Sequence, residues 1–260
     1  MIKEILLTGI FLCGLCSMTW GTNQNPTSYK MSTLSTNNVK STSSETNYLL
    51  HWTVGKQVSF NSVTTFGLDR CFKIESISDA TFNRMKGKTW KKDCPLNRND
   101  FRYIKVLHYT ADNKIKIGEL VCNKAIATDI VKIFRQLFDK RYPIEKMVLI
   151  DNYDADDERS MTDNNTSCFN FRHIAGTKHL SKHSLGMAID INPLYNPCVR
   201  TIKGKQKITP NAGKTYANRM KQNIPYKIDH QDLCYKLFIS HGFKWGGNWK
   251  SLKDYQHFEK

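Results

Sequence analysis

The chain has 260 residues, 40% of them hydrophobic and 11% aromatic, so it can bury a core in one large or two small domains. Its net charge of +16 predicts attraction to polyanions, namely nucleic acid, anionic lipid or an anionic cell wall. It has no long Lys/Arg run and no nucleic-acid motif, so we expect the anionic cell envelope as its partner, with no nucleic acid and no protein partner. Two G-K-T fragments, at Gly87 and Gly213, lack the upstream glycine of a phosphate-binding loop, which excludes that site.

Residues 1–21 are expected to form a signal peptide. Their apolar stretch, Ile5 to Leu15, is too short to span a bilayer, and small residues favour cleavage after Gly21. Lipidation of Cys13 or Cys16 would instead make the protein a lipoprotein, but the residues just before them are large. We therefore expect cleaved export, to the periplasm or the cell envelope.

Residues 22–47 are rich in Ser, Thr and Asn and contain few apolar side chains. Such a segment buries too little surface to order itself, so we predict a flexible tether. The folded domain is expected to span residues 48–260.

Six cysteines remain after the signal segment, and an even count in an exported chain permits up to three disulfides. Buried free cysteine is the alternative, because it is also a common core residue. Only Cys71 and Cys94 are close enough in sequence to suggest a local bridge. The six are Cys71, Cys94, Cys122, Cys168, Cys198 and Cys234.

The middle of the chain gives the clearest secondary-structure pattern. Two apolar-rich runs, Tyr103–Tyr109 and Lys114–Val121, flank a turn and predict a β-hairpin. Apolar residues at helical spacing predict a helix from an Asn123 cap to about Arg141. Met147–Ile150 is then expected to form a short buried strand.

Further along, Met187–Ile191 is predicted to be a strand and residues 194–227 a long surface excursion. Asp229 is expected to cap a final helix that runs through Ile239. Short strands, a hairpin and separated helices together predict an α+β fold.

The chemistry concentrates in two motifs. The first, S-K-H-S-L-G-M-A-I-D-I-N-P, carries His183 and Asp190, and the carboxy-terminal W-G-G-N-W-K-S-L-K-D-Y-Q-H-F-E carries Asp254 and His257. Hydrolytic zinc sites use three protein ligands, typically imidazoles and a carboxylate, and leave one position for water. Two histidines and Asp190 satisfy that set, and Asp254 remains as a carboxylate for proton transfer.

These motifs resemble the two signatures of the M15 peptidases, which include zinc D-alanyl-D-alanine carboxypeptidases and dipeptidases and L-alanyl-D-glutamate endopeptidases. The resemblance is greatest to the bacterial envelope branch described as D-alanyl-D-alanine carboxypeptidase-like. The segments D-D-E-R-S-M and D-N-N-T-S-C-F-N-F-R are also similar to that branch, so the resemblance extends over about Phe72 to Lys260.

The resemblance implies one Zn²⁺ ion held by His183, Asp190 and His257, with Asp254 as the catalytic base. It also implies that Arg172 faces the active site, where it would bind a substrate carboxylate or stabilise the oxyanion. Ser181 precedes the first ligand and is expected to bind substrate or to shape the turn. The implied fold is a small antiparallel sheet flanked by helices, as in the zinc domain shared with hedgehog-type proteins.

The expected function is therefore that of an exported zinc metallopeptidase that hydrolyses amide bonds in peptidoglycan stem peptides, like a D-alanyl-D-alanine carboxypeptidase. Cleavage of an L-alanyl-D-glutamate or cross-bridge bond by an endopeptidase is the nearest alternative. A non-catalytic peptidoglycan-binding zinc protein is the second. The presence of Asp254 argues against it, because a scaffold needs only the metal ligands.

Overall fold

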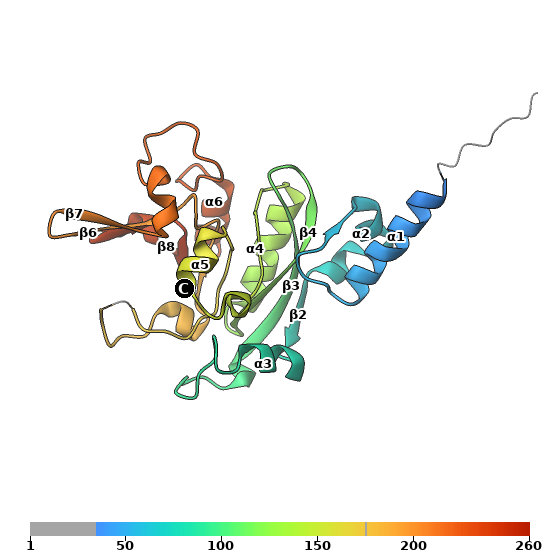
Figure 1. Ribbon diagram of the computed structural model, residues 1–260, viewed down its shortest axis with the longest axis horizontal. Coiled ribbons are helices and arrows are strands. Elements are labelled where there is room, and N and C mark those ends of the chain that lie inside the picture. Colours follow the sequence, from blue (N-terminus) through green and yellow to red (C-terminus); the bar gives the residue numbers. More distant parts are fainter. Residues whose placement is uncertain (1–34, 175) are drawn as a thin grey trace, which may run out of the picture.

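The computed structural model describes residues 35–174 and 176–260 (Figure 1). The predicted signal peptide lies outside the described residues. Within them, no helix is both long enough and apolar enough to cross a membrane. The fold is α+β, as predicted, with small antiparallel sheets and helices packed against them.

The main sheet is built on the predicted hairpin, which is confirmed. Its strands pair continuously from Phe101 opposite Asn123 to Tyr109 opposite Ile115, and most of their residues are buried. The sheet order is β1 (Gln57–Val58), β4 (Ile115–Asn123), β3 (Phe101–Tyr109) and β2 (Lys73–Ser76). The helices before and beside this sheet are α2 (Phe60–Phe66), α3 (Asp79–Met85) and α4 (Ala127–Asp139).

Helix α4 packs against the hairpin (Figure 1). Ile130, Phe134 and Leu137 are almost fully buried there, and burial of each side chain stabilises the fold by about 1.5–3 kcal/mol. The helix begins at Ala127, so the prediction that Asn123 caps it is wrong. Asn123 is instead the last residue of β4. Its backbone and side-chain N–H groups donate to the carbonyl oxygens of residues 186 and 185, so its side-chain amide does not cap the helix.

The predicted tether, residues 22–47, overlaps a helix. Helix α1 (Ser35–Leu50) begins inside that segment, and the part of the tether before it lies outside the described residues. Glu45 accepts a hydrogen bond from Ser62 Oγ at 2.7 Å, and Leu49 is buried. The end of α1 is therefore attached to the folded domain by contacts that composition does not reveal.

Two smaller sheets are formed by the carboxy-terminal part of the chain. One has the order β5 (Ala188–Asp190), β10 (His257–Glu259) and β8 (Lys244–Trp245), and the other β7 (Lys205–Thr209), β6 (Cys198–Ile202) and β9 (Leu252–Asp254). The strand predicted at Met187–Ile191 is confirmed as β5. The excursion at residues 194–227 contains the β6–β7 hairpin, which projects from the body of the protein (Figure 1).

Two other predicted elements differ from the structure. Met147–Ile150 forms no strand, because the backbone of Val148 bonds to the side chain of Asn165 rather than to a strand ladder. The last helix, α6 (Leu233–Ser240), is capped by Asp232, whose carboxylate accepts the Tyr235 N–H at 3.2 Å. Asp229, the predicted cap, lies before the helix.

All six cysteines of the described residues are free, including Cys71 and Cys94. Four of them are buried, and burial raises the pKa of the Cys71 thiol to about 12. The four buried thiols therefore behave as small core side chains.

Candidate metal centre

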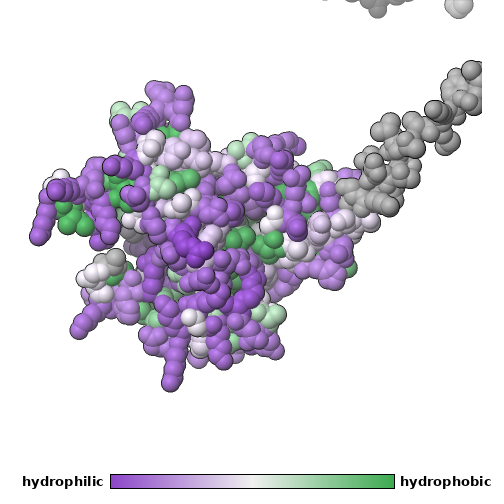
Figure 2. Space-filling view, in the orientation of Figure 1, coloured by the Kyte–Doolittle hydropathy of each residue, from purple (hydrophilic) through white to green (hydrophobic). Residues whose placement is uncertain are grey.

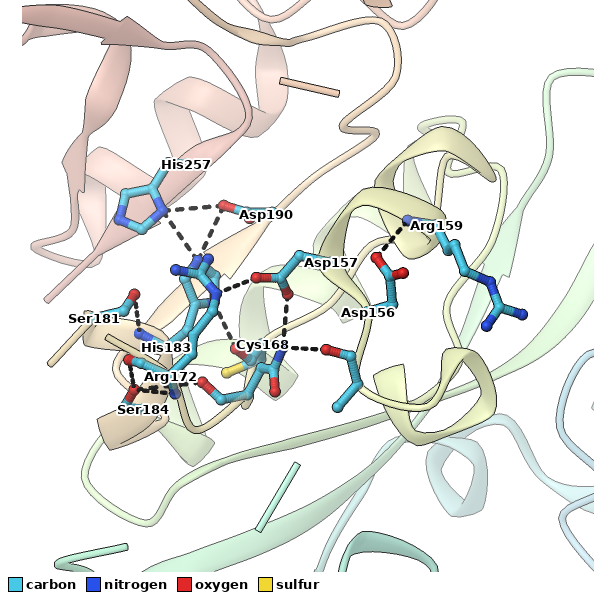
Figure 3. Close-up of polar contacts among 12 residues, drawn as sticks. Asp156, Asp157, Arg159, Cys168, Arg172, Ser181, His183, Ser184, Asp190 and His257 are labelled. Atoms are coloured by element: carbon cyan, nitrogen blue, oxygen red, sulfur yellow. Dashed lines mark hydrogen bonds and ion pairs between the residues drawn. The ribbon is translucent and has the colours of Figure 1, made fainter. Parts of the chain in front are cut away.

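The structure brings together the three predicted metal ligands. His183, Asp190 and His257 are buried, and one ligand atom from each lies within 4.8 Å of the others. His183 Nε2 is 3.2 Å from His257 Nδ1, and Asp190 Oδ1 is 3.3 Å and 3.0 Å from these two nitrogens (Figure 3). Three ligand atoms thus converge on one point, although His257 is distant in sequence from the other two.

Strand pairing sets two of these ligands side by side. His257 of β10 lies directly opposite Asp190 of β5 in the antiparallel register, so the two side chains share one face of the sheet. His183 lies on the single-turn helix Lys182–Leu185 just before β5. Ser181 caps this turn, because its Oγ accepts the His183 N–H at 3.3 Å.

Gly186 ends this turn and connects it to the main sheet. Its φ of 63° lies in the left-handed region, and a Cβ at this position would lie 2.7 Å from Asn123 N. Asn123 N donates to Gly186 O at 2.9 Å. Only glycine therefore allows the turn that carries His183 to approach β4 so closely.

Each ligating imidazole has a second partner on the ring nitrogen that faces away from the site. His183 Nδ1 donates to Cys168 O at 2.6 Å, which leaves Nε2 to bind a cation. His257 Nε2 donates to Glu259 Oε2 at 3.2 Å, which leaves Nδ1 free for the same purpose. Such outer partners fix ring orientation and tautomer in zinc sites, so the residues fit a divalent metal such as zinc.

Sequence reasoning missed Glu259. The available signal was its position two residues after His257 in a strand, which places both side chains on the same face.

Opposite charges shift the titration of the two cross-strand ligands. Burial would raise the pKa of Asp190, but His183 and His257 outweigh it and hold that pKa well below its usual range. Burial would lower the pKa of His257, but Asp190 and Glu259 outweigh it and raise that pKa to about 10 in the absence of a cation. The site therefore concentrates negative charge on Asp190 and favours a positive charge beside it.

Asp254 lies beside the three ligands at the end of β9. Its Oδ1 is buried and has no hydrogen-bond partner among the described residues. Burial, with a contribution from Asp190, raises the pKa of Asp254 despite the opposing effect of His257. The backbone here is tightly packed, because a Cβ on Gly246 would lie 2.7 Å from Asp254 O.

Arg172 is oriented by a carboxylate that the sequence prediction did not single out. The Arg172 guanidinium forms an ion pair with Asp157, the first residue of α5 (Asp157–Thr162) (Figure 3). Asn170 Nδ2 donates to Asp157 Oδ1 at 2.7 Å and fixes that carboxylate. The motif D-D-E-R-S-M contained this residue, but only the fold shows which of its acidic side chains turns toward Arg172.

An open cleft of about 820 Å³ contains the predicted site. Arg172, Ser181, Asp254 and the metal-ligand set all line it. Trp249 also lines it, with its ring centroid 5.1 Å from that of His257. The other predicted site residues thus surround the ligand set, in a space large enough for a short peptide.

A buried ligand set with imidazole, carboxylate and imidazole groups, next to a further carboxylate in a cleft, defines a metallohydrolase site. Residues 175–260 match the family model described as D-alanyl-D-alanine carboxypeptidase. This part of the chain is thus an M15 metallopeptidase domain, and the predicted family is confirmed over those residues. No solved structure matches the chain significantly.

The match includes both motifs but begins after Arg172. The resemblance over residues 72–174 therefore stays a prediction.

Proposed function

We propose that the protein is a zinc-dependent peptidase that hydrolyses amide bonds in peptidoglycan stem peptides and releases a carboxy-terminal D-alanine. The observation that carries the proposal is the free, buried oxygen of Asp254 beside the converging ligands His183, Asp190 and His257. A purely structural metal site would not need an additional carboxylate with an oxygen that lacks a hydrogen-bond partner. The family match to residues 175–260 supports the type of bond.

In this proposal the three ligands hold one Zn²⁺ ion. When bound, zinc acts as a Lewis acid and lowers the pKa of its water toward about 7. Asp254 accepts a proton from the attacking water and donates it to the leaving amine. The raised pKa of Asp254 is closer to neutral pH, where one group can both accept and donate a proton.

Arg172 and Ser181 are proposed to bind the substrate. Arg172 lines the cleft with its guanidinium oriented by Asp157, and bidentate contact with a carboxylate is the geometry that arginine favours. A free carboxy terminus next to the scissile bond is the expected partner, which favours a carboxypeptidase over an endopeptidase. Ser181 lines the same cleft but also caps the turn of His183, so its substitution should affect both substrate binding and metal affinity.

We further propose that the protein acts outside the cytoplasm, at the cell wall. The amino-terminal segment has the composition of a signal peptide, and the net charge of +16 favours an anionic polymer. Intact-mass measurement of the exported protein tests this: a mature chain that starts at Thr22 supports cleaved export. A diacylglyceryl adduct on Cys13 or Cys16 would indicate a lipoprotein.

The decisive experiment measures hydrolysis of purified muropeptides by mass spectrometry, with and without a chelator. We expect free D-alanine from the zinc-loaded protein and none after chelation. Asp254→Asn should keep its zinc but lose activity by about 100-fold to 10,000-fold, the usual contribution of general acid–base catalysis.

Other outcomes separate the alternatives. Internal peptide products would identify an endopeptidase, whereas binding to sacculi without any product would identify a wall-binding protein. Loss of zinc from Asp254→Asn would make Asp254 a ligand instead of the base.

A further inference from the structure

The β6–β7 hairpin forms one wall of the cleft. Its residues alternate in direction, and Cys198, Arg200 and Ile202 of β6 line the cleft together with Lys207 and Thr209 of β7. The hairpin is fixed to the catalytic strand β9, because Cys198 pairs with Asp254 in the antiparallel register. Two cations of the hairpin therefore face the same space as the proposed catalytic base.

Arg200 and Lys207 lie directly opposite each other in the hairpin. Like charges at opposed positions destabilise a β-ladder, and no carboxylate among the described residues forms an ion pair with either of them. Arg172 differs, because it is paired with Asp157. The hairpin thus holds two unneutralised positive charges at the cleft, an arrangement that a bound anion would stabilise.

The carboxylates that line the cleft already have other roles. Asp190 contacts both imidazoles of the ligand set, Glu259 bonds to His257, and Asp254 belongs to the catalytic group. Glu158 lines a second pocket together with Lys207, but it forms no ion pair with that lysine and accepts a hydrogen bond from the Asn211 N–H at 2.5 Å. Among residues 35–174 and 176–260, no carboxylate is therefore left to neutralise the hairpin cations, and a bound anion could do so.

The surroundings of the hairpin cations strengthen such an interaction. Arg200 is half-buried, and Ile202 and Leu252 line the cleft on either side of it. Lys207 is exposed at the rim. Figure 2 shows that the projecting hairpin is mainly hydrophilic, with a small hydrophobic area. Because charge interactions are stronger where water is partly excluded, Arg200 should contribute more than Lys207.

We propose that Arg200 and Lys207 form a second carboxylate-binding subsite, which selects acidic peptides with a side-chain carboxylate on the amino-terminal side of the scissile bond. The proposal rests on the proposed peptidase function and specifies its substrate class. Strand residues advance by about 3.3 Å each, so Arg200 lies about 7 Å along β6 from the position opposite Asp254. Because the carboxy terminus of the substrate is proposed to bind Arg172, the side chain that can reach Arg200 lies on the amino-terminal side, about two residues before the scissile bond.

The test uses two synthetic peptides that end in D-alanyl-D-alanine and differ only two residues before the scissile bond, glutamate in one and glutamine in the other. The enzymes are the wild type, Arg200→Gln, Arg200→Lys, Lys207→Gln and Lys205→Gln. Lys205→Gln is the matched control, because it removes the same charge from the same strand at a residue outside the cleft lining. Kinetics are measured with zinc-loaded protein, and peptide binding is measured calorimetrically in the Asp254→Asn background.

We expect the wild type to prefer the glutamate peptide, mainly through KM. Arg200→Gln should reduce that preference about tenfold and Lys207→Gln about threefold, as expected for a half-buried and an exposed charge pair. Arg200→Lys should retain most of the preference, and Lys205→Gln all of it. Binding in the Asp254→Asn background should follow the same order.

Equal cleavage and equal binding of both peptides by every variant would overturn the subsite and leave the peptidase function intact. A preference in binding that depends on Arg200, with no cleavage by the wild type, would keep the subsite and overturn the peptidase. Equal losses for the glutamate and glutamine peptides in Arg200→Gln would also overturn the subsite, because they would indicate a general structural effect.

Discussion

Replacement of Glu259 tests whether the outer partner of His257 controls the metal centre. Glu259 Oε2 accepts the His257 Nε2–H at 3.2 Å, while His257 Nδ1 lies 3.0 Å from Asp190 Oδ1. In Glu259→Gln an amide oxygen can still accept that hydrogen bond, but the negative charge is gone. In Glu259→Ala both are lost, and the ring can rotate away from the position that it holds in β10.

The expected magnitude follows from this geometry. Loss of an outer partner usually weakens metal binding by about 10-fold to 100-fold. The Glu259 side chain is only 23% exposed, so solvent screens its charge incompletely. We therefore expect zinc affinity to fall about tenfold in Glu259→Gln and about 100-fold in Glu259→Ala, since charge-assisted hydrogen bonds are about twice as strong as neutral ones.

Zinc affinity is measured by competition with a chromophoric chelator at pH 7.5, with circular dichroism as a check on folding. Glu75→Gln is the control, because it removes a carboxylate that pairs with Lys105 on the main sheet, far from the ligands in the fold. Unchanged zinc affinity in a folded Glu259→Ala protein would refute the reasoning. It would mean that strand pairing alone orients His257.

Three further predictions concern substrate binding, pH and packing. Asp157→Asn should raise KM about tenfold for peptides with a free carboxy terminus, because Arg172 loses its ion pair; zinc content measured in parallel should not change. Burial lowers the pKa of His108 to about 4, whereas the unfolded value is about 6.5. Between these values only the unfolded state binds the proton, so stability should fall by up to about 3 kcal/mol as the pH drops from 6.5 to 4. Urea titrations should show this fall in the wild type and not in His108→Asn, which can keep the hydrogen bond to a backbone carbonyl. Gly246→Ala should destabilise the fold by about 1–3 kcal/mol and lower activity, because its Cβ would lie 2.8 Å from Asp254 Cβ; an unchanged melting temperature and activity would contradict the packing argument.

The three candidate metal ligands could be predicted from the sequence because their chemistry is specific and their motifs are local. His183 and Asp190 lie within one short segment, and His257 follows Asp254 in another. Two short motifs that together carry two histidines and two carboxylates rarely occur in one chain by chance. The main hairpin could be predicted equally well, because its two apolar-rich runs and the turn between them are neighbours in sequence.

The outer contacts could not be predicted in the same way. Asp157 reaches Arg172 only because α5 packs beside the segment that ends at residue 172, and Asp156 in the same motif caps the helix instead. The start of α4 was misjudged for a related reason. Asn123 is a residue type that often caps helices. Its backbone N–H instead donates a hydrogen bond to the carbonyl oxygen of Gly186, which is distant in sequence.

What the sequence by itself determined is therefore the identity of the candidate groups: the three proposed metal ligands, the additional carboxylate of Asp254 and the strongly basic composition. Tertiary structure decided how these groups face one another. The β5–β10 register sets Asp190 beside His257, and the β6–β9 register brings Arg200 to the cleft wall. The physical reason is that local spacing fixes which side chains share a strand or a turn, whereas hydrogen bonding between distant strands fixes which of those strands meet.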